Sequence, residues 1–429
     1  MDFLAVLNEI DNFIWGPPLL VLLVGTGILL TIRLHLLQIF KLPKALSLIF
    51  RAQNAGSGDI DSFKALCTAL SATVGTGNIV GVATAIHAGG PGALFWMWMA
   101  AFFGMATKYA EGLLAVKYRE TDEKGEIAGG PMYYIKNGMG KKYKWLGGLF
   151  AFFGVLVAYF GIGTFAQVNS IVDITKMTIG LDPVWTGAIL TIFVAAITIG
   201  GLQSIAAAAS RIVPAMAFIY FLSTIGVLLV FADKVPAAVS MIFESAFTTT
   251  AATGGSAPIV AAAAKTKWPA EQGLISMTGT FIDTIIICTL TGLTLVVTGV
   301  WCGMENGAAL TNAAFTSAFP VFGGYMLLIG LVLFAFTTIL GWNYYGERCM
   351  IYLVGTKGVL PYRLVFILLI ASGAFLKLEA IWILADIVNG LMAIPNLIAL
   401  LFLSGICVRE TKKYMDHLKT GKPYEEYED

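Results

Sequence analysis

The sequence is poor in charged residues. Asp, Glu, Lys and Arg together make up 12% of its 429 residues, whereas soluble globular proteins contain about 25%. Hydrophobic residues make up 58%. This composition excludes an ordinary soluble domain and predicts an all-α polytopic membrane protein, because helices are the expected spanning elements. The net charge of +1 argues against nucleic acid as a partner.

Histidine and cysteine are also scarce. The three histidines are too few for a convincing metal cluster, and the five cysteines show no CxxC spacing. The sequence offers no nucleophile–base pair and no phosphate-binding loop, so we expect neither an enzyme nor a bound cofactor. The first residues, MDFLAVLNEID, lack the basic region of a secretory signal, so no cleavable signal is expected.

The most informative stretch is 66–88, LCTALSATVGTGNIVGVATAIHA, which is about one bilayer thickness long at roughly 20 residues per span. A continuous helix here is disfavoured, because Gly75, Gly77 and Gly81 each cost roughly 1 kcal/mol relative to Ala. Asn78 offers the backbone a competing hydrogen bond. The pattern predicts two half-helices joined by unwound backbone between Gly75 and Asn78.

Unwound backbone inside a membrane survives only where it is buried in protein or lines a water-filled cavity. The second half-helix then directs its free N–H groups and the positive end of its dipole toward the bilayer midplane, where an anion can bind. An alternative is a packing face, because Gly77 and Gly81 form a small-xxx-small pair. The residues alone leave both interpretations open.

The hydrophobic segments predict about eleven membrane crossings. A first span at about 13–37 precedes two groups of five, and each group opens with a glycine-interrupted segment, 66–88 and then 237–264. Since five is odd, the second group is inverted, and paired interrupted segments in inverted halves are typical of transporters. The predicted parts are an N-terminal helix with its linker, two inverted repeats and a solvated charged tail, at residues 1–64, 65–233, 234–408 and 409–429.

The distribution of basic residues predicts the orientation. Lys and Arg gather in loops that the predicted crossings place on one side of the bilayer. The positive-inside rule therefore puts the C-terminus in the cytoplasm and the N-terminus outside the cell membrane. These loops are 38–64, 117–144, 265–267, 346–363 and the tail. Within them, GGPMYYIKNGMG predicts a short interfacial helix with Tyr133 and Tyr134 at headgroup level.

Three motifs resemble one known family. ATVGTGNIVGVATAI, GGPGALFWMWMAAFFGMATKYAEGLLAVKYR and GGPMYYI are similar to those of the alanine/glycine:cation symporters, and the resemblance extends over nearly the whole chain. It implies the five-plus-five inverted-repeat fold of the bacterial leucine transporter with one additional N-terminal helix. It also implies sodium-driven uptake of alanine or glycine by alternating access.

The chain departs from this family in its second interrupted segment. TTTAATGG runs directly into Ser256-Ala257-Pro258, so that about one helix length is missing relative to the family pattern. Residues 256–264 still match the second half-helix of the family. A shortened form that binds amino acids without transporting them is therefore an alternative to a working symporter.

An amino-acid substrate presents a carboxylate and an ammonium group. Unpaired N–H groups around Gly77, Asn78 and Ile79 suit the carboxylate, and the side chains of Thr76 and Asn78 add donors. The predicted substrate-binding residues are Gly75, Thr76, Gly77, Asn78, Gln167 and Trp342.

Carbonyl groups freed at Ala72–Gly75, or the amide oxygen of Gln167, suit the ammonium. Trp342 is expected to wall the pocket and restrict it to small side chains. An interhelical hydrogen bond by Gln167 and an interfacial position for Trp342 are equally weighted alternatives.

Sodium requires oxygen ligands. The family's fold places one ion between the first broken helix and the eighth core helix, which implies the carbonyls of Ala72 and Gly75 and the hydroxyls of Thr337 and Thr338 as its ligands. Without the resemblance, a Thr pair in a membrane helix more often bonds the carbonyls four residues earlier.

Acidic residues within membrane segments are candidates for function. Asp283, in TFIDTIIICTL, is the most isolated, and it either holds an ion or pairs with a polar neighbour. Asp386 more simply links two helices through polar contacts. A proton-coupled transporter in which Asp283 or Asp386 titrates is a further alternative. Glu111 lies three residues after Lys108, which favours an ion pair.

Overall fold

The computed structural model describes residues 3–49, 61–123, 125–247, 268–376 and 379–423. Nearly all of them are helical, as the composition predicts. In the first half the elements are α1 (Phe3–Ile14), α2 (Pro17–Arg33), α3 (Leu37–Phe40), α4 (Leu42–Ile49), α5 (Ser62–Thr73), η1 (Thr76–Asn78), α6 (Val80–Gly89), α7 (Gly92–Lys117), β1 (Glu120–Thr121), β2 (Ile127–Ala128), α8 (Pro131–Tyr134), η2 (Ile135–Met139), η3 (Lys141–Tyr143), α9 (Lys144–Phe160), α10 (Phe165–Ile179), α11 (Pro183–Thr198) and α12 (Gly201–Val230).

The second half is also helical. Its elements are η4 (Ala232–Lys234), α13 (Val235–Ser245), α14 (Pro269–Thr280), the π-helix η6 (Phe281–Cys288), α15 (Thr289–Thr298), η7 (Val300–Cys302), α16 (Gly307–Ala318), α17 (Gly323–Val354), η8 (Thr356–Gly358), α18 (Val359–Gly373) and α19 (Glu379–Thr420). Most of the second interrupted segment predicted at 237–264, including the junction at Ser256, lies outside the described residues.

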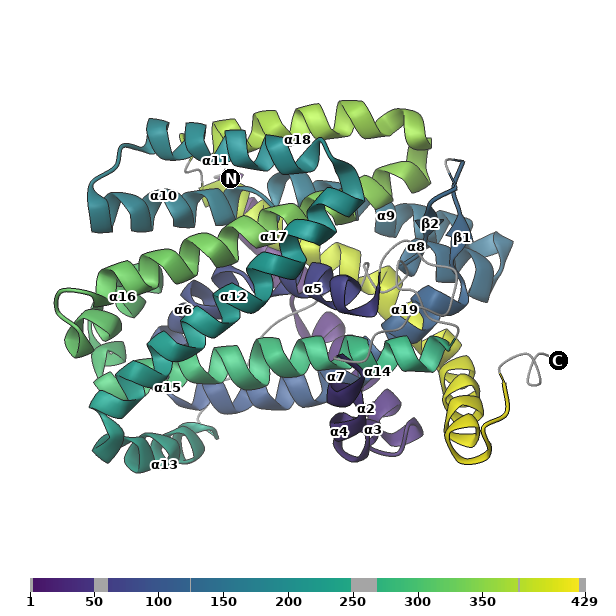
Figure 1. Ribbon diagram of the computed structural model, residues 1–429, viewed down its shortest axis with the longest axis horizontal. Helices are drawn as coiled ribbons and strands as arrows, with labels where there is room; N and C mark the ends of the chain where they lie inside the picture. The colour runs from purple at the N-terminus through teal and green to yellow at the C-terminus, as the bar shows by residue number, and fades with distance from the viewer. Residues whose placement is uncertain (1–2, 50–60, 124, 248–267, 377–378, 424–429) are drawn as a thin grey trace.

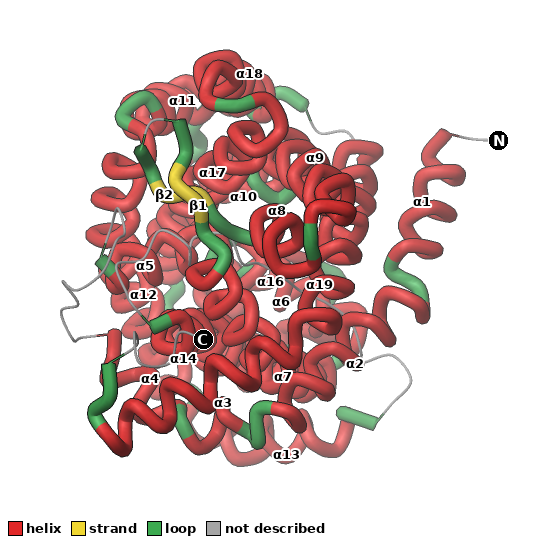
Figure 2. The backbone as a smooth tube through the Cα atoms, turned by 90° about the vertical axis from the view of Figure 1, so that its right-hand side faces the viewer, coloured by secondary structure: helices red, strands yellow, loops and turns green. Residues whose placement is uncertain are grey.

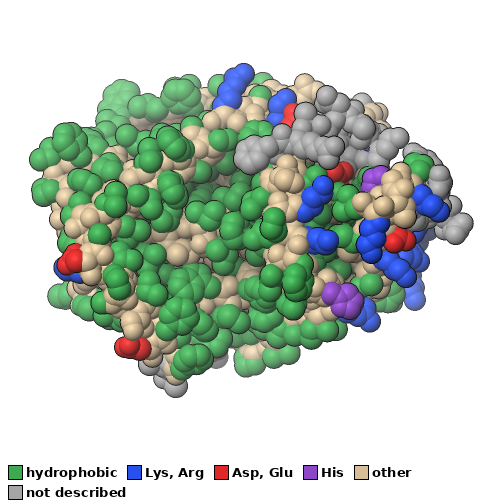
Figure 3. Space-filling view, turned by 60° about the horizontal axis from the view of Figure 1, so that its bottom comes forward, with side chains coloured by type: hydrophobic (Ala, Val, Ile, Leu, Met, Phe, Trp, Pro, Cys, Tyr) green, Lys and Arg blue, Asp and Glu red, His purple; other side chains and the backbone are tan. Residues whose placement is uncertain are grey.

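Seven helices in the described part are long and apolar enough to cross a membrane, or eight spans if the bent pair α5 and α6 counts as one. Large hydrophobic side chains are exposed over the outer helices, as expected for a surface in contact with lipid. Figure 3 shows hydrophobic side chains over most of one face, with Lys and Arg gathered toward one end. The seven helices are Phe3–Arg33, Lys141–Ile179, Gly201–Val230, Pro269–Thr298, Gly323–Val354, Thr356–Gly373 and Trp382–Thr420.

The helices lie in layers. α10, α11 and α18 form one outer layer, and α7, α14 and α15 form the opposite one (Figures 1 and 2). α5, α6, α12 and α17 lie between them. α5 and α17 approach closely because Gly341 has no side chain: a Cβ there would lie 2.6 Å from the backbone nitrogen of Ala72. The interrupted helix is therefore held in the interior of the molecule.

Two expectations about the charged loops are wrong. Tyr133 and Tyr134 are buried in the protein rather than placed among headgroups, and the Tyr134 hydroxyl donates a hydrogen bond to Asn396 on α19. The tail is not solvated from residue 409, because α19 continues to Thr420. Glu410 on this extension is buried and pairs with Lys117 at 2.9 Å.

The β1–β2 hairpin follows α7 and lies beside α8 (Figure 2). It is tied to the end of α17 by Arg348, whose guanidinium lies 2.6 Å from the Glu126 carboxylate and 3.5 Å from that of Asp122. The preceding residue, Glu347, forms a two-point ion pair with Arg363 of α18 at 2.6 and 3.0 Å. This end of α17 is thus fixed on two sides.

The hairpin also forms an ion pair with the segment that follows it, through Glu120 and Lys136. The side chains of Lys136 and Asn137 each donate to the Glu120 carboxylate at 2.8 Å. Partial burial alone would raise the pKa of Glu120, but these hydrogen bonds outweigh it and hold the pKa below its usual value of 4.5.

Candidate functional site

The predicted interruption is present. α5 ends at Thr73, α6 begins at Val80, and their axes differ by 65°. Gly75 is extended, with φ −138° and ψ −156°. The N–H groups of Asn78 and Ile79 bond the carbonyls three residues earlier, each at 3.1 Å, so the α-helical pattern does not run through this segment. Residues 74–79 are called the break below, and the prediction of unwound backbone here is confirmed.

Two backbone donors in the break are satisfied by side chains. The N–H of Gly75 donates to Oδ1 of Asn78 at 2.9 Å, and the N–H of Thr76 donates to Oε1 of Gln167 at 3.3 Å. These contacts replace the hydrogen bonds that a continuous helix would supply, as buried backbone groups require.

Gly77 and Gly81 have no described side chain packed against them. Among the described residues, no atom lies within 4 Å of a Cβ built on Gly77 or Gly81. A small-xxx-small packing face would bring a second helix into that space. The described residues therefore give no support to the packing interpretation.

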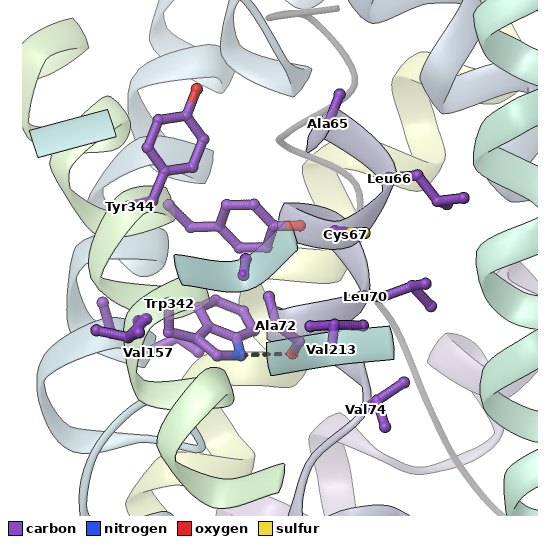
Figure 4. Packing of buried hydrophobic residues seen from close by; sticks show 14 of the residues in the cluster. Ala65, Leu66, Cys67, Leu70, Ala72, Val74, Val157, Val213, Trp342 and Tyr344 are labelled. Carbon is purple, nitrogen blue, oxygen red and sulfur yellow. Dashed lines mark hydrogen bonds between the residues drawn. The ribbon is translucent and has the colours of Figure 1, made fainter. Parts of the chain in front are cut away.

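α17 lies against the break and contacts it at two points. Nε1 of Trp342 donates to the carbonyl of Ala72 at 3.1 Å (Figure 4). Oγ1 of Thr338 donates to the carbonyl of Val74 at 3.2 Å. Trp342 is 1% exposed, so the interpretation of this residue as an interfacial aromatic is wrong. A Cβ on Gly75 would collide with the Thr338 hydroxyl, which shows how closely the two segments approach.

The two threonines predicted to bind sodium differ in position. Both bond the carbonyl four residues earlier, Thr337 to Leu333 at 3.0 Å and Thr338 to Phe334 at 2.9 Å. Only Thr338 also reaches the break. The Thr337 hydroxyl lies 3.3 Å from the sulfur of Met216 on α12. Among the described residues, the Thr338 hydroxyl and the carbonyls of Ala72 and Val74 thus take part in the hydrogen bonds that join α17 to the end of α5.

Gln167 is buried on α10 and is engaged at both ends of its amide. Oε1 accepts from Thr76, and Nε2 donates to the carbonyl of Ile162 at 2.9 Å. This is the interhelical hydrogen bond that the sequence offered as an alternative. A role in binding the ammonium group, through the second lone pair of Oε1 or after release of Thr76, stays a prediction.

Asn78 is linked to an acidic residue 205 positions away. Nδ2 of Asn78 donates to Oδ1 of Asp283 at 2.8 Å, and Asp283 lies in the π-helix η6. Of the two interpretations of Asp283, pairing with a polar neighbour is thus observed. The partner was not predicted, although an isolated carboxylate and an amide, each in an apolar stretch, are the residue types expected to meet.

A further polar cluster lies between α7, α8 and α19. Nδ2 of Asn396 donates to Glu111 at 2.6 Å, the Tyr134 hydroxyl donates to Asn396, and Nζ of Lys108 lies 3.9 Å from Glu111. The predicted Lys108–Glu111 pair is present, within this buried cluster. The backbone carbonyl of Asp386 accepts from Nε1 of Trp15 at 3.1 Å, and a link between helices through the Asp386 side chain stays a prediction.

Comparison with known proteins gives a consistent result. A model of the sodium:alanine symporter family matches residues 1–428. An uncharacterized transporter of Haemophilus influenzae is 54% identical, with 98% of this chain and 98% of the relative covered. The sodium/alanine symporter AgcS of Methanococcus maripaludis is 50% identical (96% and 98% covered), and the uncharacterized transporter YflA of Bacillus subtilis is 36% identical (98% and 94% covered).

The lengths of these alignments reveal missing residues. The alignment with the Haemophilus relative has 447 positions against 429 residues in this chain, a difference of 18. At least that many positions of the alignment therefore have no residue in this chain. The difference is similar in size to one membrane-spanning helix of about 20 residues, and its assignment to the second interrupted segment stays a prediction.

Proposed function

The chain belongs to the sodium:alanine symporter family, and we propose that it is a sodium-coupled symporter that imports alanine or glycine by alternating access. The observation that carries the proposal is the break, with open space beside Gly77 and with α17 bonded to its other side. A helix N-terminus that faces such a space is suited to a carboxylate. In this scheme Gly75, Thr76, Gly77 and Asn78 bind the substrate.

The remaining contacts define the rest of the site. Trp342 limits the size of the substrate side chain, and Gln167 exchanges its hydrogen bond with Thr76 for one with the substrate ammonium. Sodium binds between the break and α17, where the family's fold implies Ala72, Gly75, Thr337 and Thr338 as ligands. Of these side chains, Thr338 has the stronger support, because its hydroxyl already lies at the break.

The architecture that we propose around this site is the five-plus-five inverted repeat of the leucine transporter, with an additional N-terminal helix and about eleven crossings. The seven or eight apolar spans of the described residues account for most of them. α7, at 26 residues, is about 39 Å long and reaches across a bilayer. The basic loops favour a cell-membrane protein with its N-terminus outside and its C-terminus in the cytoplasm.

Coupling arises because each ligand favours the arrangement that the other needs. Sodium at the carbonyls of the break would hold the unwound backbone in place, and a bound amino acid would complete the closed cavity. The test is uptake of radiolabelled alanine by purified protein in proteoliposomes. We expect accumulation under an inward sodium gradient, competition by glycine, and loss of accumulation when choline replaces external sodium.

Two other outcomes would identify different functions. Uptake driven by a pH gradient without sodium would indicate proton coupling. Saturable alanine binding without accumulation would indicate a shortened, transport-deficient form, which the shortfall of at least 18 positions favours as the second candidate. Inserting into this chain the corresponding segment of a relative is then expected to restore accumulation.

A further inference from the structure

Asn78 is held at three separate atoms. Its Oδ1 accepts from the N–H of Gly75 at 2.9 Å, and its Nδ2 donates to the carboxylate of Asp283 at 2.8 Å and to the Asp283 carbonyl at 3.2 Å. Its own carbonyl accepts from the hydroxyl of Thr291 on α15 at 2.8 Å. Among the described residues, the Asn78 side chain thus connects the break to η6.

The direction of the Asn78 amide matters because its two ends have opposite hydrogen-bonding character. If the amide were rotated by half a turn, its NH₂ group would face the N–H of Gly75, and its oxygen would face the Asp283 carboxylate. At Gly75 a donor would then face a donor, and at Asp283 an acceptor would face an acceptor. The carboxylate, at the shorter distance, and the backbone carbonyl of Asp283 therefore both favour the orientation in which Oδ1 accepts from Gly75.

Asp283 is itself firmly placed. Its second oxygen, Oδ2, accepts from the Thr284 hydroxyl at 2.8 Å. The π-helical turns of η6 interrupt the regular pattern between α14 and α15, and π-helical insertions in α-helices are frequent at functional sites. η6 packs against α7, on which Lys108 is buried.

We propose that Asp283 is a positioning residue: its carboxylate fixes the Asn78 amide, and through it the N–H of Gly75, so that the break keeps its unwound shape. The consequence for transport rests on the proposed function, since it assumes that the break binds the substrate. The effect on the break itself does not.

The first test is hydrogen–deuterium exchange of the full-length protein in detergent, without substrate. In Asp283→Leu we expect exchange at the amides of residues 75–79 to rise on the order of tenfold, as loss of a buried hydrogen bond implies. The matched control is Thr294→Val on α15, which removes a buried hydroxyl that has no hydrogen bond among the described residues. Exchange in this control is expected to equal that of the wild type.

A swap of the two side chains tests the hydrogen-bond direction, including the case in which Asp283→Leu fails to fold. Asn78→Asp alone places two carboxylates together and should raise exchange in the break. Adding Asp283→Asn supplies an amide donor to the new carboxylate, whose other oxygen still accepts from Gly75, so exchange should return toward the wild-type rate. Alanine uptake should follow the same order, with a higher KM for the single variant.

Two results would overturn the proposal. One is exchange at residues 75–79 in Asp283→Leu that matches the Thr294→Val control. The other is a double variant that is no better protected than Asn78→Asp alone. Because exchange is measured without substrate, a wild-type protein that fails to accumulate alanine would count against the proposed function and leave the positioning test intact.

Discussion

Replacing Gly75 with alanine should separate tight packing at the break from its backbone conformation. The φ of −138° is accessible to any residue, so the backbone gives no reason for glycine at this position. The added methyl group, however, would meet the Thr338 side chain, with Cβ and Cγ2 of Thr338 at 3.2 and 3.3 Å and its hydroxyl closer still. Thr338 is short and cannot move aside without changing its rotamer.

The expected cost follows from these contacts. Overpacking by one methyl group costs about 1–3 kcal/mol, and rotation of Thr338 away from the Val74 carbonyl sacrifices a hydrogen bond worth about 1 kcal/mol. We therefore expect Gly75→Ala to destabilise the protein by about 2–4 kcal/mol. Gly77→Ala is the matched control, because its methyl group meets no described atom within 4 Å.

The assay is thermal unfolding in detergent, followed by size-exclusion chromatography after heating. Gly75→Ala should lose its folded peak at a lower temperature than the wild type, and Gly77→Ala should not. Thr338→Ala removes the obstructing atoms, so the double variant should be more stable than the sum of the two single changes predicts. Equal melting of both glycine variants, or strict additivity with Thr338→Ala, would refute this account of the break.

Three further predictions concern other contacts. Trp342→Phe keeps most of the aromatic packing but removes the indole N–H that donates to the Ala72 carbonyl, so we expect a loss of about 1–3 kcal/mol in stability. Trp342→Ala also removes the packing and should cost about 3–5 kcal/mol. The same thermal assay measures both. Arg348→Gln removes the guanidinium that pairs with Asp122 and Glu126 of the hairpin and should raise hydrogen–deuterium exchange there, whereas exchange in the break should be unchanged if the hairpin opens locally. Folding lowers the pKa of Glu120, so the ionised carboxylate stabilises the hairpin at pH values above the usual pKa of 4.5, and this stabilisation is lost as the pH falls through the lower pKa of the folded state. Hydrogen–deuterium exchange in the hairpin should therefore rise at acid pH. Glu120→Gln should reduce that pH dependence.

The location of the break could be predicted because its causes are local. Glycine and asparagine disfavour a helix wherever they stand, so the sequence 75–78 was sufficient to place the interruption. The difference between Thr337 and Thr338 was not predictable. Both can bond the carbonyl four residues earlier, and only the rotation of α17 relative to α5 decides which hydroxyl reaches the Val74 carbonyl.

Residues with both apolar and polar parts were the hardest to place. Trp342 suits a membrane interface as well as a packed interior, and its contact with Ala72 joins positions 270 residues apart. The charged stretch after residue 408 has the composition of a solvated tail. Its Glu410 is nevertheless buried, where it pairs with Lys117 on α7, a partner distant in the sequence. Such long-range pairings are set by the packing of helices, which local composition does not encode.

The attachments of α17 determine where the molecule can separate. From Thr338 to Arg348 the helix is about 15 Å of continuous rod. One end of this rod is joined to α5 by two neutral hydrogen bonds, and the other is anchored to α18 and to the hairpin by ion pairs with little exposure to water. Moving α5 away from α17 breaks neutral hydrogen bonds, whereas moving α17 away from α18 or from the hairpin separates charges that are largely buried, which costs more per contact. We therefore expect α17, α18 and the hairpin to move together as one unit relative to α5.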